Sequence, residues 1–89
     1  MSEPWRELRV GDRIRVVRLP SGWGRPGYHV PTCTRRLFRR LIERGRPLRV
    51  YEVDEDGLPW VRCRFRLAKG WEHHFLAVND DSWVRVLSR

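Results

Sequence analysis

One stretch of the chain alternates between apolar and basic residues, and this predicts a β-strand with two unlike faces. In residues 60–67, the odd positions are Val61, Cys63, Phe65 and Leu67, and the even positions are Trp60, Arg62, Arg64 and Arg66. Side chains alternate between the two faces of a strand, so the apolar set is expected in a core. The arginine set is expected in water, beside a tryptophan.

Turn-forming residues divide the rest of the chain into further short strands. Gly11-Asp12 precedes the alternation at Ile14 and Val16, and the segment 54–57, Asp-Glu-Asp-Gly, is typical of a hairpin turn. Another turn is expected at Lys69-Gly70, and 79–82 interrupts the chain before its last strand. Five strands are therefore expected, at about residues 13–17, 48–53, 60–67, 71–78 and 83–87.

A single short helix is expected at about residues 34–44. Thr32 or Thr34 can cap it, Gly45 suits the left-handed closing position, and Pro47 prevents continuation. The apolar positions form one stripe: Leu37, Phe38, Leu41 and Ile42. The remaining face is basic.

The chain has 89 residues, which is one domain without room for a second core. We expect a single domain over 1–89, with residues 1–7 as an N-terminal arm. The core is expected to contain the inward side chains of the strands and one helix residue: Ile14, Val16, Leu41, Val50, Val61, Cys63, Phe65, Val84 and Val86.

The pattern of five short strands and one inserted helix favours a small, mostly-β barrel closed from a meander. Two segments resemble the SH3-like barrels of bacteria: Leu8-x-Val10-Gly11-Asp12-x-Ile14-x-Val16 and Asn79-Asp80-Asp81-Ser82-Trp83-Val84. Gly24-x-x-Gly27-x-x-Val30 is similar to the glycine-spaced loop of KOW-type RNA-binding modules. The resemblance implies a five-stranded SH3-like barrel.

Charge points to a polyanionic partner. The formal net charge is +8, and every basic residue except Lys69 is an arginine. The outward strand positions provide a candidate nucleic-acid-binding set of five arginines and one stacking ring: Arg13, Arg15, Trp60, Arg62, Arg64 and Arg66. Two alternatives stay open. The arginine excess can reflect the composition of the source genome, or the face can be solvated and paired across strands, for example Glu52 with Arg62.

A long loop supplies a second candidate surface. Residues 19–31 contain three glycines and three prolines, and long ordered loops are often functional. In an SH3-like barrel this loop borders the ligand groove, which implies a groove lined by Trp23, Tyr28, His29 and Trp83. Such a groove suits a protein or peptide partner. Alternatively, the Trp23 or Tyr28 ring folds back to cap the barrel.

The sequence lacks the motifs of an enzyme or of a metal site. No nucleophile elbow, phosphate loop or paired carboxylates occur, and the cysteines and histidines lack the spacing of zinc ligands. We therefore expect no catalysis, no metal and no cofactor. Cys33 and Cys63 are most simply reduced thiols.

The expected location is the cytoplasm, because no signal peptide and no membrane-spanning apolar run is visible. The leading hypothesis is a non-catalytic, monomeric module that binds RNA or single-stranded DNA. The alternatives are a protein-interaction or regulatory domain, and a subunit whose apolar surface is covered by an identical chain.

Overall fold

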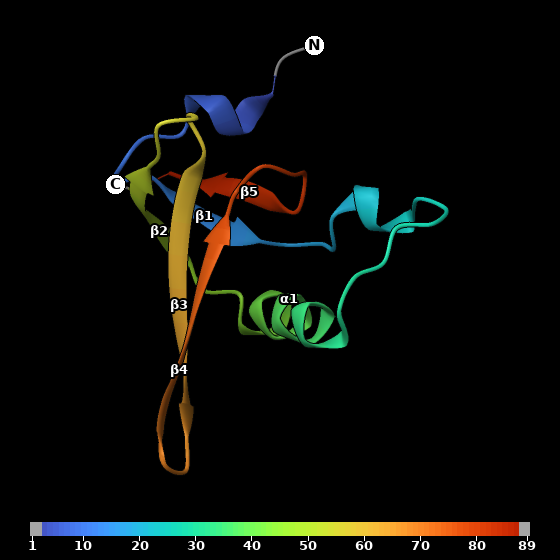
Figure 1. Cartoon of the computed structure of the whole chain (residues 1–89). Coiled ribbons are helices and arrows are strands. Elements are labelled where there is room, and N and C mark those ends of the chain that lie inside the picture. The colour runs from blue at the N-terminus through green and yellow to red at the C-terminus, as the bar shows by residue number, and fades with distance from the viewer. Residues whose placement is uncertain (1–2, 88–89) are drawn as a thin grey trace.

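The computed structural model describes residues 3–87 and contains five strands, one α-helix and two 3-10 helices (Figure 1). In chain order the elements are η1 (Pro4–Glu7), β1 (Arg13–Val16), η2 (Ser21–Gly24), α1 (Thr32–Arg44), β2 (Leu48–Val53), β3 (Pro59–Leu67), β4 (Gly70–Ala77) and β5 (Trp83–Val86). The expected mostly-β architecture with one inserted helix is confirmed. No helix among residues 3–87 is long and apolar enough to cross a bilayer.

The five strands form one antiparallel sheet in the order β4-β3-β2-β1-β5. The start of β2 pairs with β1 through Leu48 and Arg49, whereas β2 pairs with β3 from Val50 onward. No strand ladder within residues 3–87 joins β4 to β5, so closure into a barrel is not found. All four residues of β5 pair with β1, and the β3–β4 hairpin extends away from them (Figure 1).

Strand β3 has the alternation that its sequence predicts. Val61, Cys63 and Phe65 are buried, whereas Arg62, Arg64 and Arg66 are exposed. Only Leu67 departs from the pattern, because it lies at the tip of the hairpin, beyond the core, and is 46% exposed.

The predicted core is confirmed for every residue except those of the last strand. Val84 and Val86 are only partly buried, because β5 pairs with β1 in a register that places Val84 opposite Arg15 and Val86 opposite Arg13. Both valines therefore lie on the outward side of the sheet. Trp83, opposite the buried Val16, packs against the core instead.

Helix α1 begins two residues before the predicted start. Pro31 occupies the N-cap position, and its carbonyl accepts the backbone N–H groups of Thr34 and Arg35. Neither threonine caps the helix through its side chain, which corrects the prediction. The predicted end is confirmed, since Gly45 closes the helix at φ +62°. The apolar stripe joins the core cluster, with Leu37, Phe38 and Leu41 buried and Ile42 partly buried.

The N-terminal segment contributes to the core. Residues 1 and 2 of the expected arm lie outside the described residues, and Pro4–Glu7 forms the 3-10 helix η1. Trp5 and Leu8 are both buried in the main cluster. The first tryptophan of the chain is therefore a structural residue.

Candidate functional site

The β3–β4 hairpin carries the most distinctive surface of the molecule. Its turn is Ala68-Lys69, and Gly70 follows at φ +137°, a backbone conformation that residues other than glycine rarely adopt. The turn sets the register, so that Arg66 lies opposite Trp71, Arg64 opposite His73, and Arg62 opposite Phe75. Directly opposite residues of an antiparallel pair share one face of the sheet.

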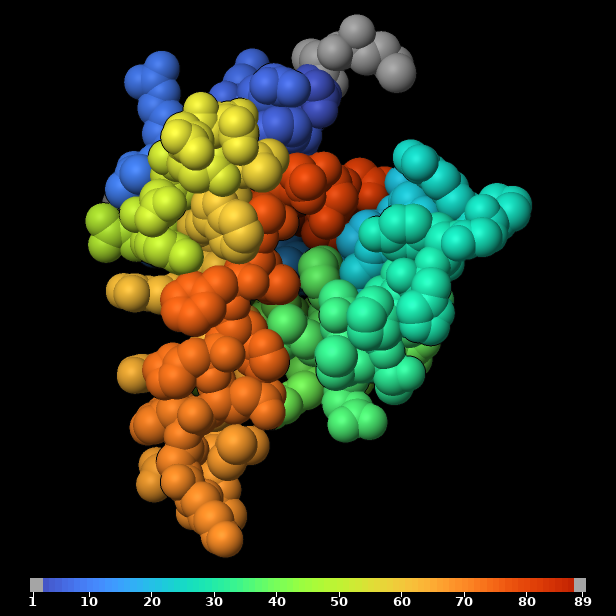
Figure 2. Space-filling model, in the orientation of Figure 1, coloured from blue at the N-terminus to red at the C-terminus, as the bar shows by residue number. Residues whose placement is uncertain are grey.

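We call this surface the outer hairpin face. It comprises the side chains on the side of β2, β3 and β4 away from the core: Tyr51, Arg62, Arg64, Arg66, Trp71, His73 and Phe75. Figure 2 shows the hairpin projecting from the body of the molecule, with side chains of β3 extending on the side opposite α1. Arg62, Arg64, His73 and Phe75 line a shallow hollow of about 510 Å³ on this face, with Cys63 at its border.

Guanidinium groups and aromatic rings alternate on the outer hairpin face. The Arg62 guanidinium lies 5.4 Å from the Tyr51 ring centroid, and the Tyr51 and Phe75 rings meet edge to face at 6.2 Å. Nearer the tip, Arg64 and Arg66 lie 4.4 Å and 5.9 Å from the Trp71 ring. The rings therefore hold the arginines along the face by cation–π contact, without neutralising their charge.

No carboxylate forms an ion pair with an arginine of the outer hairpin face within residues 3–87. The arginine ion pairs found in that range lie elsewhere: Arg6 with Glu3, Arg40 with Glu72, and Arg85 with Asp12. A register irregularity between Val50 and Glu52 places Glu52 opposite Trp60, so it does not pair with Arg62 as the alternative hypothesis expected. The positive charge of this face is left for solvent or a partner.

Arg13 and Arg15 lie on the same side of the sheet but not on the hairpin. Both are exposed on β1, which β2 separates from β3. Arg13 lies directly opposite Arg49 of β2, a like-charge pair that is unfavourable without an anion. Arg49 in turn lines a hollow of about 320 Å³ together with Val10, Tyr51 and Arg62, and so connects the two groups of arginines.

Trp60 is half-buried and held at the turn end of β3. Its indole N–H donates to Asp54 Oδ2 at 2.9 Å. Asp54 Oδ1 also accepts the backbone N–H groups of Asp56 and Leu58. The hydrogen bond from Trp60, followed by that from Leu58, lowers the pKa of Asp54. Trp60 thus has a structural hydrogen-bond partner, whereas Trp71 and Phe75 are 49% and 58% exposed and contact other residues of the outer hairpin face: Arg64, Arg66 and Tyr51.

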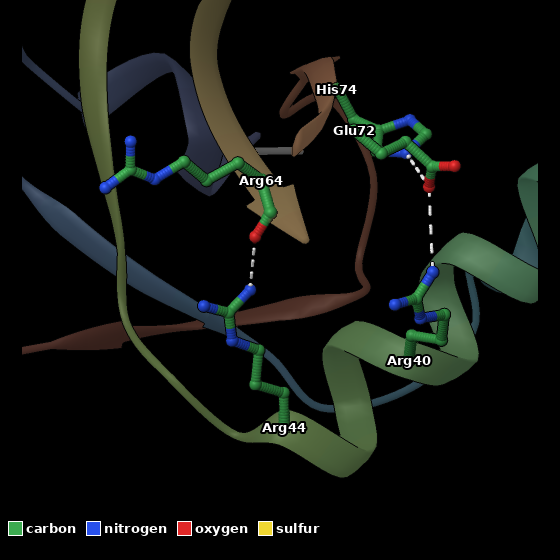
Figure 3. A network of polar contacts seen from close by, with 5 residues as sticks. All are labelled: Arg40, Arg44, Arg64, Glu72 and His74. Carbon is green, nitrogen blue, oxygen red and sulfur yellow. Dashed lines mark hydrogen bonds and ion pairs between the residues drawn. The ribbon is translucent and has the colours of Figure 1, made fainter. Parts of the chain in front are cut away.

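A polar network fixes the hairpin to α1 from the opposite side (Figure 3). Arg44 Nη1 donates to the Arg64 carbonyl at 2.8 Å, while the Arg64 side chain points away from Arg44. Arg40 lies 3.6 Å from Glu72 Oε1 and 3.9 Å from the Phe65 ring centroid. These contacts anchor the inner face of the hairpin.

Glu72 also binds His74, with Oε1 and Nε2 at 2.7 Å, and this hydrogen bond lowers the pKa of Glu72. His73 and His74 therefore have different environments, as the alternation of a strand requires. His73 is exposed on the outer hairpin face, and His74 is half-buried against the helix side.

The four residues expected to line a ligand groove are not brought together. Trp23 packs edge to face on Phe38 at 4.8 Å, and Trp83 turns toward the core with its indole N–H bonded to the Asp80 carbonyl. Tyr28 is 55% exposed and His29 is exposed. A hollow of about 410 Å³ between η2 and residues 79–81 includes Trp23 and Tyr28 but neither His29 nor Trp83.

The two cysteines are free, with Cys33 exposed and Cys63 buried. Burial raises the pKa of the Cys63 thiol. Within residues 3–87, no three His, Cys, Asp or Glu side chains are placed to hold a metal ion.

Sequence reasoning missed the aromatic half of the outer hairpin face: Tyr51, Trp71 and Phe75. The signal was the parity of β4, in which Trp71, His73 and Phe75 alternate with Glu72, His74 and Leu76. Either placement of a two-residue turn, at 68–69 or at 69–70, puts the odd residues of β4 beside the even residues of β3. The parity of β4 could therefore have identified Trp71 and Phe75 as neighbours of the arginines, whereas Tyr51 lies on β2, at a register irregularity that the sequence does not reveal.

No protein-family model matches the chain, and searches of curated proteins and of solved structures found no significant match.

Proposed function

We propose that the protein is a non-catalytic module that binds nucleic acid, as RNA or single-stranded DNA, through the outer hairpin face. The observation that carries the proposal is the row formed by Arg62, Arg64 and Arg66, which lacks ion-pair partners within residues 3–87 and lies in register with exposed rings. Arg13 and Arg15, linked to this row through Arg49, are proposed as flanking phosphate contacts.

The physical basis is the combination of two interactions on one surface, both of which single-stranded nucleic acid uses. Guanidinium groups neutralise phosphates and release counterions, and aromatic rings stack on unpaired bases. Asp54, Asp80 and Asp81 lie in turns, and Glu72 faces α1, while Glu52 lies opposite Trp60 at the end of this surface away from the hairpin tip. A partner with regularly spaced negative charge fits such a row better than a neutral peptide does.

We also propose that the fold is an open relative of the SH3-like barrel. In its support, the strands follow a meander and the last strand returns to pair with the first. The peptide-binding alternative has weaker support, because of its expected aromatic residues Trp23 packs on Phe38 and Trp83 packs inward.

The test is the salt dependence of binding, compared between two variants of equal charge. Fluorescence anisotropy of labelled oligo(U) and oligo(dT) measures the affinity at several salt concentrations. One variant replaces Arg62, Arg64 and Arg66 with alanine. The control replaces three exposed helix residues, Arg35, Arg36 and Arg39, and removes the same three charges from a total of +8.

We expect the affinity of the wild type to fall as the salt concentration rises. A plot of the logarithm of the association constant against the logarithm of the salt concentration should have a slope of about −2 if three phosphates are neutralised, at about −0.7 for each. The hairpin variant should lose most of that slope, and the helix variant should retain it. Equal losses in both variants would show that net charge, and not this surface, drives binding. Binding that is absent at low salt would remove the proposal.

A further inference from the structure

We infer that the hairpin binds single-stranded nucleic acid through two rows of side chains. Those of β3 contact the phosphates, and those of β4 stack on the bases. This inference rests on the proposed function and specifies the ligand as unpaired nucleic acid. It is supported by the register of the β3–β4 ladder, by the exposure of the rings on β4, and by the absence of a covering element on that face among residues 3–87.

The register produces two parallel rows. Arg62, Arg64 and Arg66 lie at every second position of β3, and directly opposite them on β4 lie Phe75, His73 and Trp71. Successive side chains in each row are roughly 7 Å apart, because a strand rises about 3.4 Å per residue. Each arginine thus has a ring-bearing residue opposite it in the register, although the guanidinium groups of Arg64 and Arg66 both contact the Trp71 ring.

The Phe75 and Trp71 rings are both partly exposed to solvent, with the Arg64 guanidinium 4.4 Å from the centroid of the Trp71 ring. Phe75 is 58% exposed and Trp71 is 49% exposed, although large aromatic side chains usually contribute to a core. The fold does not need them there, because Phe65 and Cys63 already fill the inner face of the hairpin. Two such rings on a protruding hairpin form a stacking platform, comparable in size to sheets that stack two or three bases.

A duplex does not fit this platform equally well. The flat faces of paired bases are covered by their neighbours in the stack, so a duplex offers phosphates to the β3 row but nothing to the β4 row. Single-stranded nucleic acid offers phosphates to the β3 row and exposed base faces to the β4 row. The inference therefore predicts a preference for unpaired strands that originates in Trp71 and Phe75 and not in the arginines.

The experiment compares three labelled oligodeoxynucleotides of one length: a single strand, the same strand with abasic sites, and a duplex. An oligo(U) of the same length tests whether RNA is bound in the same way. The variants are Trp71→Ala and Phe75→Ala, and the control is Tyr28→Ala, which removes a ring of similar exposure (55%) from the loop. Circular dichroism verifies that each variant is folded.

We expect the abasic strand and the duplex to bind more weakly than the intact single strand. Each ring variant should lose about 5-fold to 150-fold in affinity for the intact strand, as base stacking is typically worth, with its salt slope unchanged. Tyr28→Ala should bind like the wild type. Loss of affinity in the ring variants together with an unchanged slope distinguishes stacking from loss of charge contacts.

Equal binding of intact, abasic and duplex ligands would overturn the inference while leaving in place nucleic-acid binding through the arginine row of the outer hairpin face. Ring variants that bind the intact strand as tightly as the wild type would overturn it as well. Failure of every ligand to bind at low salt would overturn both.

Discussion

Phe65 and Phe75 belong to the same hairpin but lie on opposite faces of it. Phe65 is 7% exposed, and the Arg40 guanidinium lies 3.9 Å from its ring centroid. Phe75 is 58% exposed and contacts the Tyr51 ring edge to face. At the scale of single residues, position within the alternation decides whether a phenylalanine stabilises the fold or is available to a ligand.

Phe65→Ala should lower the free energy of unfolding by about 3–5 kcal/mol, because it leaves a cavity between β3 and α1. The total free energy of unfolding of a small domain is about 5–15 kcal/mol, so at the low end of this range much of the population should unfold. Phe75→Ala, the matched control, should stay within about 1 kcal/mol of the wild type. Urea unfolding followed by tryptophan fluorescence measures both. A larger loss for Phe75→Ala than for Phe65→Ala would contradict the assignment of the two faces.

At the scale of helices and strands, turns determine where an element ends and which residues of neighbouring strands lie opposite one another. The Gly45 closure of α1 and the hairpin turn after Asp54 were both predictable, because each places glycine where φ is positive. The start of α1 was not, since a backbone carbonyl at Pro31 replaces the expected threonine cap. The turn before β4 has the greatest effect on the candidate site, because it sets the register of both rows.

Gly70→Ala should destabilise the protein by about 1 kcal/mol or more, because φ is +137° and an added Cβ meets strain in the backbone and not a clash. Gly24→Ala is the matched control, since its position is open and has no positive φ. The control should be neutral or slightly stabilising. Thermal unfolding of the two variants measures the difference. A stable Gly70→Ala variant would show that the turn tolerates a different geometry.

The whole molecule combines a large positive charge with carboxylates that are bound in the folded state. Within residues 3–87, four carboxyl groups have a lowered pKa, each mainly through a hydrogen bond that its carboxylate accepts: Asp12 from the Arg9 backbone, Asp54 from Trp60, Glu72 from His74, and Asp81 from the Ser21 backbone. Because these pKa values are lower in the folded state than in the unfolded state, the carboxylate forms stabilise the fold.

The stabilisation from these carboxylates should therefore be fully present at pH values above the ordinary pKa values of 3.8 for Asp and 4.5 for Glu. It should be lost as the pH falls through their lower pKa values in the folded state. Loss of negative charge also increases repulsion among the arginines. Urea unfolding at a series of pH values measures the loss. Asp54→Asn should be less stable than the wild type near neutral pH, and this difference should shrink in acid. A constant difference across the series would contradict the role of the Asp54 carboxylate.

The alternation of residues 60–67 predicted a strand with one buried and one exposed face, and half of the candidate site. It identified Val61, Cys63 and Phe65 as buried and Arg62, Arg64 and Arg66 as exposed, because alternation along a strand is a local property. The same rule was not sufficient for β5. Val84 and Val86 alternate as Ile14 and Val16 do, but their face depends on the register with β1.

The sequence by itself determined which segments form strands, where most turns fall, and which side of β3 is cationic, since these depend on residues close together in the chain. Tertiary structure decided what lies beside those arginines. Strand pairing brought Tyr51 to Arg62, set which arginine each ring of β4 faces, placed Glu52 opposite Trp60, and left the sheet open between β4 and β5. These outcomes depend on pairings between distant segments, whose partners no local pattern specifies.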